Sequence, residues 1–201
     1  MSKSWIRERV RDRYYRRAKA EGYRSRAAYK LIQIDRRFHL LGRGDAVVDL
    51  GAAPGGWSQV AREAVGPGGV VVAVDLGGFA PLEGVDFVKG DARDEATLDA
   101  VHERLPRGAD VLLSDMSPKL SGNKGLDHAR SIDLAETGLE AARRLLREGG
   151  HFVTKVFQGD MYPDFLRRVR GDFRKAKGHA PDASPATSSE MYVVARGRRT
   201  G

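Results

Sequence analysis

Short apolar runs alternate along the chain with segments in which apolar residues recur at helical intervals. The short runs, rich in Val, Leu and Phe, predict strands at residues 46–50, 69–75, 85–89, 109–115, 150–157, 173–179 and 190–196. The helical intervals predict helices at residues 25–40, 57–65, 94–104, 128–147 and 161–170. Because strands and helices alternate, we expect a mostly parallel sheet with helices on both faces.

The last predicted strand differs from the others in how the chain reaches it. Residues 181–189 connect it to the preceding strand and are rich in Pro and Ser. Parallel neighbours need a crossover of about a dozen residues or more, and this connection is too short to supply one. We therefore predict an α/β fold whose sheet is mostly parallel, with an antiparallel last strand.

A glycine-rich loop follows the strand at residues 46–50 directly. Its residues, 51–56, read Gly-Ala-Ala-Pro-Gly-Gly and lead into Trp57. Glycines let the backbone approach a bound nucleotide-like molecule closely. A dinucleotide site would have the pattern G-x-G-x-x-G, whereas here Ala53 stands at the second glycine position and Pro54 lies in the turn. The loop predicts S-adenosylmethionine as the ligand; an ordinary tight turn between strand and helix is the alternative.

Carboxylates stand at the ends of four predicted strands, namely Asp49, Asp75, Asp91 and Asp115. Ligands of open α/β sheets bind beyond the carboxyl ends of the strands. We expect Asp75 to bind the ribose hydroxyls of the cofactor, Asp91 to bind the adenine edge, and Asp115 to lie where the methyl group meets its acceptor. Each aspartate taken alone is also a common helix cap or turn former.

Lys155 lies within an apolar run, where an ammonium group without a partner would be costly. We therefore expect its side chain to face the site at the strand ends. Glu190 opens the last strand and Lys30 precedes the first one, so both are candidates to complete a polar cluster around Asp115. Sequence spacing does not show whether these four side chains meet.

The chain has the length of one domain, and we predict a single domain over residues 1–201. Its formal net charge is +8, and the whole excess lies at the N-terminus, where residues 1–30 carry eleven Lys or Arg and three acids. Residues 31–201 carry 24 of each kind. Clustered cations gain affinity for phosphates by releasing counterions, so we interpret residues 1–24 as a basic extension, partly helical, that binds RNA. A solubilising tail is the alternative.

The chain contains no cysteine, which excludes disulfides and zinc sites built on cysteine. It also argues against methylation of a pyrimidine ring carbon, which usually needs a Cys nucleophile. We predict no metal site. No stretch approaches the roughly 20 apolar residues of a membrane helix, and the charged N-terminus does not resemble a signal peptide. We expect a cytoplasmic protein without a membrane partner.

Six runs, in order along the chain, carry a resemblance to a known family: SRAAYKL at 25–31, DLGAAPGGWSQ at 49–59, GVDF at 84–87, SDM at 114–116, KVFQG at 155–159 and SEMY at 189–192. The chain resembles the FtsJ family, called RrmJ or RlmE in bacteria. The resemblance implies a Rossmann-like class I methyltransferase fold and 2′-O-methylation of a ribose, a uridine of the A-loop, in large-subunit ribosomal RNA. A tRNA ribose methyltransferase and a noncatalytic assembly factor remain alternatives.

The resemblance also assigns roles to individual residues. It implies a catalytic tetrad of Lys30, Asp115, Lys155 and Glu190, with Lys155 as the base that accepts the ribose proton. The physical chemistry leaves a second role open, in which Lys155 stays charged and stabilises the developing alkoxide. The implied cofactor contacts are Gly51, Pro54, Gly55, Gly56, Trp57, Asp75, Asp91 and Asp115.

Two further expectations concern the partner and the departures from the family pattern. We expect a monomer that acts on ribosomal RNA within the large subunit. Lys119 and Lys124 lie in the loop after Asp115, where more neutral residues are typical of the family, and they put the choice of RNA target in doubt. No pattern of an appended RNA-binding domain follows Glu190, although some archaeal relatives carry one.

Overall fold

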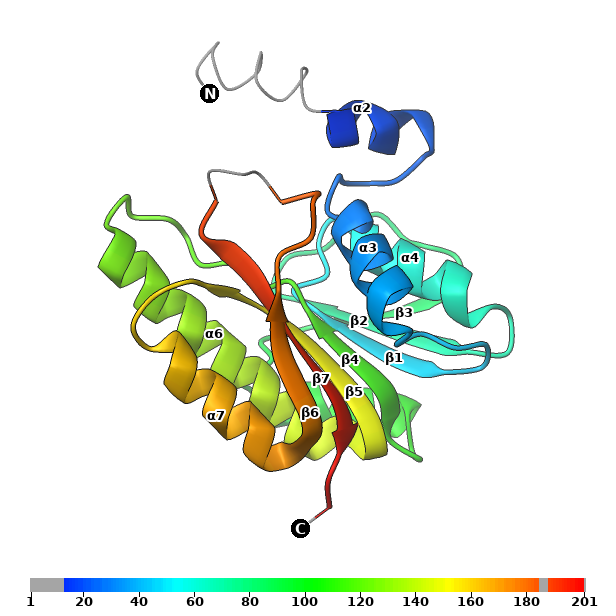
Figure 1. Cartoon of the computed structure of the whole chain (residues 1–201). Helices are drawn as coiled ribbons and strands as arrows, with labels where there is room; N and C mark the ends of the chain where they lie inside the picture. Colours follow the sequence, from blue (N-terminus) through cyan, green and yellow to red (C-terminus); the bar gives the residue numbers. More distant parts are fainter. Residues whose placement is uncertain (1–12, 185–187, 201) are drawn as a thin grey trace.

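The computed structural model describes residues 13–184 and 188–200. Seven strands form one sheet in the order β3-β2-β1-β4-β5-β7-β6 (Figure 1). The strands are β1 (Ala46–Leu50), β2 (Val70–Asp75), β3 (Val85–Lys89), β4 (Ala109–Ser114), β5 (Leu146–Phe157), β6 (Phe173–His179) and β7 (Glu190–Arg198). The pairings among β1 to β5 are parallel, and β7 runs antiparallel to both β5 and β6. The predicted fold class, with its antiparallel last strand, is confirmed.

The structure describes six helices, of which α3 to α7 cover the two faces of this sheet and α2 packs against α3. They are α2 (Arg13–Ala20), α3 (Ala28–Phe38), α4 (Gly56–Val65), α5 (Glu95–Arg104), α6 (Lys124–Leu145) and α7 (Tyr162–Asp172). Helices α3 and α4 pack on one face, and α6 and α7 lie on the other (Figure 1). No described helix is long and apolar enough to span a membrane.

Side chains of β1 show why both faces need helices. Val47 joins the apolar cluster under α3 and α4, whereas Val48 and Leu50 join the larger cluster under α5, α6 and α7. Successive side chains of a strand point to opposite faces of the sheet, so a strand that is apolar at consecutive positions needs packed helices on both faces. Asp49 shares the face of Val47 and therefore points toward α4.

Some boundaries differ from the predicted ones. Strand β5 begins at Leu146, four residues before the predicted start, because Ala109 pairs with Leu146 before the register shifts between Ala109 and Val111. Helix α6 begins at Lys124, where the Asn123 side chain accepts a hydrogen bond from the Leu126 amide and caps the helix. The predicted basic helix is described from Arg13 onward, and its earlier part lies outside the described residues.

The strand order creates the position of the site. From β1 the chain moves outward through β2 to β3, and it then returns to add β4 and β5 on the other side of β1. The two directions separate between β1 and β4, at the carboxyl ends of these parallel strands. This is the topological switch point, where doubly wound sheets bind their ligands.

Candidate active site and cofactor hollow

The glycine-rich loop turns the chain from β1 into α4 within a few residues. Gly51 has φ 71° and Gly55 has φ 104°, which are values that residues with a Cβ rarely adopt. A Cβ on Gly51 would lie 2.7 Å from the Cγ of Met116, the residue after Asp115. The loop after β1 and the end of β4 therefore touch because residue 51 is glycine.

A hollow lies between this loop and the end of β4. It is lined by Ser25, Ala27, Asp49, Gly51, Ala52, Ala53, Pro54, Gly56, Trp57 and Asp115. The predicted cofactor contacts Gly51, Pro54, Gly56, Trp57 and Asp115 are among them, and Gly55 belongs to the same loop. Asp75 and Asp91 are not part of this lining; they lie at the end of β2 and just after β3.

The carboxylates of Asp75 and Asp91 already shape the backbone around them. Asp75 accepts hydrogen bonds from the Ala53 amide at 2.9 Å and from the Gly77 amide at 2.8 Å. Asp91 accepts one from the Arg93 amide at 3.0 Å. A carboxylate has about four lone-pair sites, so both side chains keep acceptor capacity for a ligand. Their cofactor contacts stay predictions.

Asp49 is fully buried and only partly satisfied. Its Oδ2 accepts a 2.6 Å hydrogen bond from the Ser58 hydroxyl, and its Oδ1 has no partner among the described residues. Burial raises the pKa of Asp49 to about 7; the Ser58 hydrogen bond opposes this rise, while the charges of Asp115 and Asp75 add to it. An unpartnered carboxylate oxygen in the wall of a hollow suits a cationic ligand, and S-adenosylmethionine carries a sulfonium and an ammonium group.

The four residues of the predicted tetrad meet beside this hollow. Nζ of Lys155 lies 2.7 Å from the backbone oxygen of Asp115 and 3.1 Å from its Oδ1. Nζ of Lys30 lies 2.5 Å from Oε1 of Glu190. Both lysines are buried, with 6% and 7% of Lys155 and Lys30 exposed. Lys155 therefore points into the site, as its apolar sequence context indicated.

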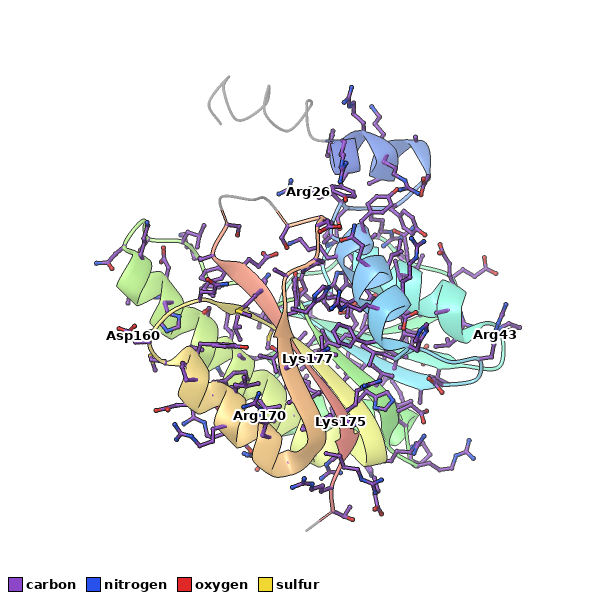
Figure 2. All side chains as sticks on the ribbon, viewed as in Figure 1. Arg26, Arg43, Asp160, Arg170, Lys175 and Lys177 are labelled. Carbon is purple, nitrogen blue, oxygen red and sulfur yellow. The ribbon has the colours of Figure 1, made fainter. Side chains whose placement is uncertain are left out.

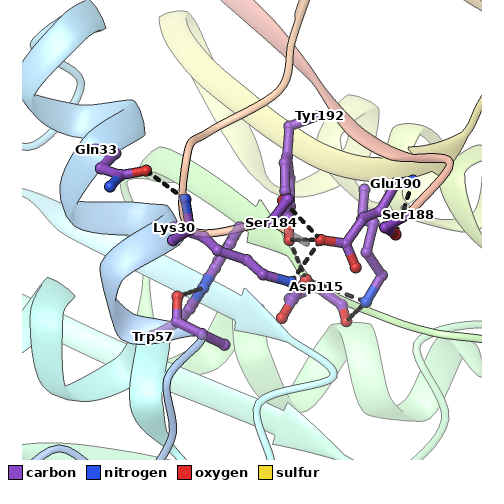
Figure 3. A network of polar contacts seen from close by, with 11 residues as sticks. Lys30, Gln33, Trp57, Asp115, Ser184, Ser188, Glu190 and Tyr192 are labelled. Atoms are coloured by element: carbon purple, nitrogen blue, oxygen red, sulfur yellow. Dashed lines mark hydrogen bonds and ion pairs between the residues drawn. The ribbon is translucent and has the colours of Figure 1, made fainter. Parts of the chain in front are cut away.

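Tyr192 joins the two ion pairs and was not among the predicted site residues. Its hydroxyl donates a 2.8 Å hydrogen bond to Oδ1 of Asp115 and lies 3.3 Å from Oε1 of Glu190 (Figure 3). Its ring packs against Trp57, with 5.5 Å between the ring centroids. The sequence did hold a signal, because residues two apart in a strand share a face and Tyr192 follows Glu190 by two.

The environment fixes the charge states of two of these side chains. Burial opposes ionisation of Glu190, but the charges of Lys30 and Lys155 outweigh it and lower the pKa of Glu190 below its usual value. Burial, together with the charges of Asp115 and Glu190, raises the pKa of Tyr192 well above its usual value. Glu190 is therefore an anion and Tyr192 a hydrogen-bond donor at neutral pH.

The described part of the basic extension carries its cations on an exposed helix. In α2, Arg13, Arg16, Arg17 and Lys19 are exposed, whereas Ala18 is buried and anchors the helix. Arg26 lies close to α2 (Figure 2). Other basic side chains, such as Lys175 and Lys177, lie along β6 at the far edge of the sheet (Figure 2). Arg7, Arg9 and Arg11 lie outside the described residues, whereas Arg24 lies between α2 and α3.

Comparisons with known proteins agree with this architecture. Residues 23–198 match the model of the FtsJ-like methyltransferase family. A curated relative from Methanothrix thermoacetophila, named Ribosomal RNA large subunit methyltransferase E, is 53% identical over 186 residues, which cover 92% of this chain and 72% of the relative. A relative of the same name from Halobacterium salinarum is 50% identical over 189 residues, with 92% and 73% covered.

Two solved structures are similar to the fold. A crystal structure of a ribosomal RNA methyltransferase from Plasmodium falciparum has a TM-score of 0.77 and 26% identity, over 88% of this chain and 98% of that one. Fibrillarin from Aeropyrum pernix, solved with S-adenosyl-L-methionine, has a TM-score of 0.59 and 20% identity, over 84% and 75% of the two chains, and supports the fold alone. The family match over residues 23–198 and the identity to curated relatives show that the chain belongs to the FtsJ-like methyltransferase family.

Proposed function

We propose that the protein transfers the methyl group of S-adenosylmethionine to a ribose 2′-oxygen of large-subunit ribosomal RNA, with a uridine of the A-loop as the target. The observation that carries this proposal is the position of Asp115, which lines the cofactor hollow and also pairs with Lys155. A hydroxyl group bound at Lys155 is thus beside the methyl donor. The names of the curated relatives support ribosomal RNA as the substrate.

The reaction requires an oriented hydroxyl and the removal of its proton. A ribose hydroxyl is a poor nucleophile, so alignment with the sulfonium methyl and proton transfer are the two tasks of the site. The bound cofactor supplies an electrophilic methyl group. Asp115 holds Nζ of Lys155 through its backbone oxygen and its carboxylate, which fixes the point where the hydroxyl docks.

Two roles of Lys155 are compatible with this arrangement. As a neutral amine it accepts the ribose proton directly. As an ammonium group it stabilises the alkoxide, and the proton leaves to water or to Asp115. A pH–rate profile of single turnovers distinguishes them, because the rate increases with pH when the neutral amine is the active form and decreases when the ammonium group is.

Lys30 and Glu190 act on the substrate from the other side of Tyr192. Glu190 is an anion held by Lys30 at 2.5 Å and by the Ser184 hydroxyl at 3.1 Å. With its own position fixed in this way, Lys30 orients the ribose or a neighbouring phosphate. The exposed cations of α2 bind the RNA backbone farther out.

The test is a map of ribose methylation in RNA from a strain that lacks this protein. Loss of one ribosomal site identifies the target, and loss of a tRNA site indicates the tRNA ribose methyltransferase instead. Unchanged methylation together with defective subunits favours a noncatalytic assembly factor. Purified protein, assayed on free ribosomal RNA and on large subunits, then tells which form is the substrate.

We expect a monomer that works in the cytoplasm, where the ribosomes are.

A further inference from the structure

The segment that links α2 to α3, residues 22–27, is bound along the start of α4; we call it the strap. The Gln59 side chain accepts a 2.7 Å hydrogen bond from the Arg24 amide and donates one of 3.1 Å to the Gly22 oxygen. Nε1 of Trp57 donates to the Ala27 oxygen at 2.8 Å. The strap therefore has a fixed position over the glycine-rich loop from which α4 begins.

The Arg24 guanidinium does not point away from the protein toward an RNA phosphate. It donates to three backbone carbonyls, those of Ala80 at 2.5 Å, Pro81 at 2.6 Å and Pro54 at 3.3 Å. Its carbon lies 5.3 Å from the centroid of the Phe79 ring. The charge-based expectation that the cations of this segment face phosphate does not fit Arg24.

These contacts connect the glycine-rich loop, which lines the hollow, with the loop that follows β2. Pro54 belongs to the glycine-rich loop after β1, while Ala80 and Pro81 belong to the loop after β2, residues 76–84. Asp75 joins the same two loops through amide groups, since it accepts from Ala53 and from Gly77. The Asp75 carboxylate thus accepts hydrogen bonds from amides of both loops, and the Arg24 guanidinium donates hydrogen bonds to carbonyls of both loops.

The packing around this junction leaves little freedom. Gly55 has φ 104°, and a Cβ there would lie 3.0 Å from Nη1 of Arg24 and 3.2 Å from the Phe79 ring. A shift of the Arg24 side chain would therefore release both the glycine-rich loop and the loop after β2. The predicted ligand contact Gly55 lies on the first of these loops, and Asp75 ends β2 directly before the second.

We propose that Arg24 is a positioning residue for S-adenosylmethionine: it holds the two loops at the separation that the cofactor needs, and it does not bind RNA. This inference rests on the methyltransferase function of the chain. The guanidinium suits the task because its planar group donates hydrogen bonds from two nitrogens at once, whereas lysine has one ammonium nitrogen on a flexible side chain. Lysine at this position keeps the positive charge but loses the simultaneous hydrogen bonds to the two loops.

The experiment compares Arg24→Lys with Tyr23→Phe and Arg16→Ala. Tyr23→Phe removes a different strap contact, the 2.9 Å hydrogen bond from the Tyr23 hydroxyl to Glu63, and leaves both cofactor loops alone. Arg16 is an exposed cation of α2. Binding of S-adenosylmethionine is measured by calorimetry in the absence of RNA, and KM values for both substrates are measured in the methyl-transfer assay.

We expect Arg24→Lys to weaken cofactor binding about tenfold, because it removes one or two hydrogen bonds that the charged guanidinium makes. The KM for the cofactor should rise by a similar factor, the KM for RNA should stay the same, and saturating cofactor should restore kcat. Tyr23→Phe should leave cofactor binding within about twofold, and Arg16→Ala should raise only the KM for RNA.

An unchanged cofactor affinity in Arg24→Lys would overturn the proposal, and a raised KM for RNA alone would assign Arg24 to the RNA surface. An equal loss of cofactor affinity in Tyr23→Phe and Arg24→Lys would show a general effect of the strap and would also contradict the proposal. If the wild-type protein binds the cofactor but methylates no RNA, the proposed RNA substrate fails while the calorimetric comparison still decides the role of Arg24.

Discussion

The Tyr192 hydroxyl donates a 2.8 Å hydrogen bond to Oδ1 of Asp115, and this contact links the two halves of the tetrad. The same carboxylate oxygen lies 3.1 Å from Nζ of Lys155, while the Tyr192 hydroxyl is 3.3 Å from Oε1 of Glu190. Asp115 thus has one neighbour that is a cation and one that is a neutral donor. The hydrogen bond restricts the Asp115 carboxylate to the orientation in which it reaches Lys155.

Replacing Tyr192 with Phe should therefore lower kcat while the cofactor still binds. The ring contact with Trp57 remains, but Asp115 loses a donor and is freer to rotate away from Lys155. We expect a decrease in kcat of roughly tenfold, which corresponds to ~1.4 kcal/mol of lost transition-state stabilisation. Single-turnover rates at saturating cofactor and RNA measure it. A cofactor affinity that falls with kcat would instead mean that the substitution disturbs the hollow.

Removal of either member of the Lys155–Asp115 pair should have a larger effect. Lys155→Met keeps the length and apolar packing of the side chain, and Asp115→Asn keeps an acceptor for Tyr192, yet each removes one charge of the ion pair. We expect both to lower methyl transfer about 10²- to 10⁴-fold, the usual contribution of a positioned proton-transfer group. Folding, followed by circular dichroism, should not change. A Lys155→Met enzyme with near-normal turnover would contradict the tetrad assignment.

Particular residues show what the sequence was able to predict. The order of strands and helices followed from apolar periodicity, and the burial of Lys155 followed from the apolar residues on either side of it. Tyr192 shares a strand face with Glu190 through their two-residue spacing, but an aromatic residue in an apolar strand is most often a core residue, so the sequence does not single it out. Arg24 was grouped with the RNA-binding cations because a sequence shows where charge is, whereas the carbonyls that bind Arg24 are 30 to 57 positions away.

The role of Asp75 is testable with an altered cofactor. Asp75→Asn should weaken binding of S-adenosylmethionine by about 1 to 3 kcal/mol, since a hydrogen bond to a charged acceptor is lost. If the carboxylate binds the ribose hydroxyls, this loss should disappear for an analogue that lacks them. Calorimetry on both ligands gives the comparison, with the exposed Asp86→Asn as the control. An equal loss of affinity for both ligands would mean that Asp75 does not bind the ribose hydroxyls and acts only through its hydrogen bonds to the Ala53 and Gly77 amides.

Asp49 should make stability depend on pH. Its pKa rises from an ordinary value of 3.8 to about 7 in the folded protein, so the folded state binds the proton more tightly than the unfolded state. The contribution of Asp49 to the free energy of unfolding should therefore decrease as pH rises from about 4 and should level off above about 7. The full shift corresponds to about 4 kcal/mol.

Asp49→Asn tests this linkage because it keeps an acceptor for the Ser58 hydroxyl and cannot ionise. Denaturant unfolding without cofactor should show the variant gaining stability relative to the wild type as pH rises from 5 to 8. Ser58→Ala is the matched comparison, since it leaves the carboxyl group in place and removes its partner. A stability difference between Asp49→Asn and the wild type that does not change with pH would mean that Asp49 is already ionised at pH 5.

RNA affinity should depend on salt through the exposed cations of α2. Each phosphate contact releases counterions. Neutralising Arg13, Arg16 and Arg17 together should therefore make the slope of log RNA affinity against log salt concentration shallower by about 2 to 3. Ala18 anchors the helix and is left unchanged, and cofactor affinity should stay the same because none of the three arginines lines the hollow. The control is Lys175→Ala with Lys177→Ala, which removes two charges from the far edge strand β6. If the salt slope changes only in that control pair, RNA crosses the β6 edge and α2 carries a solubilising charge.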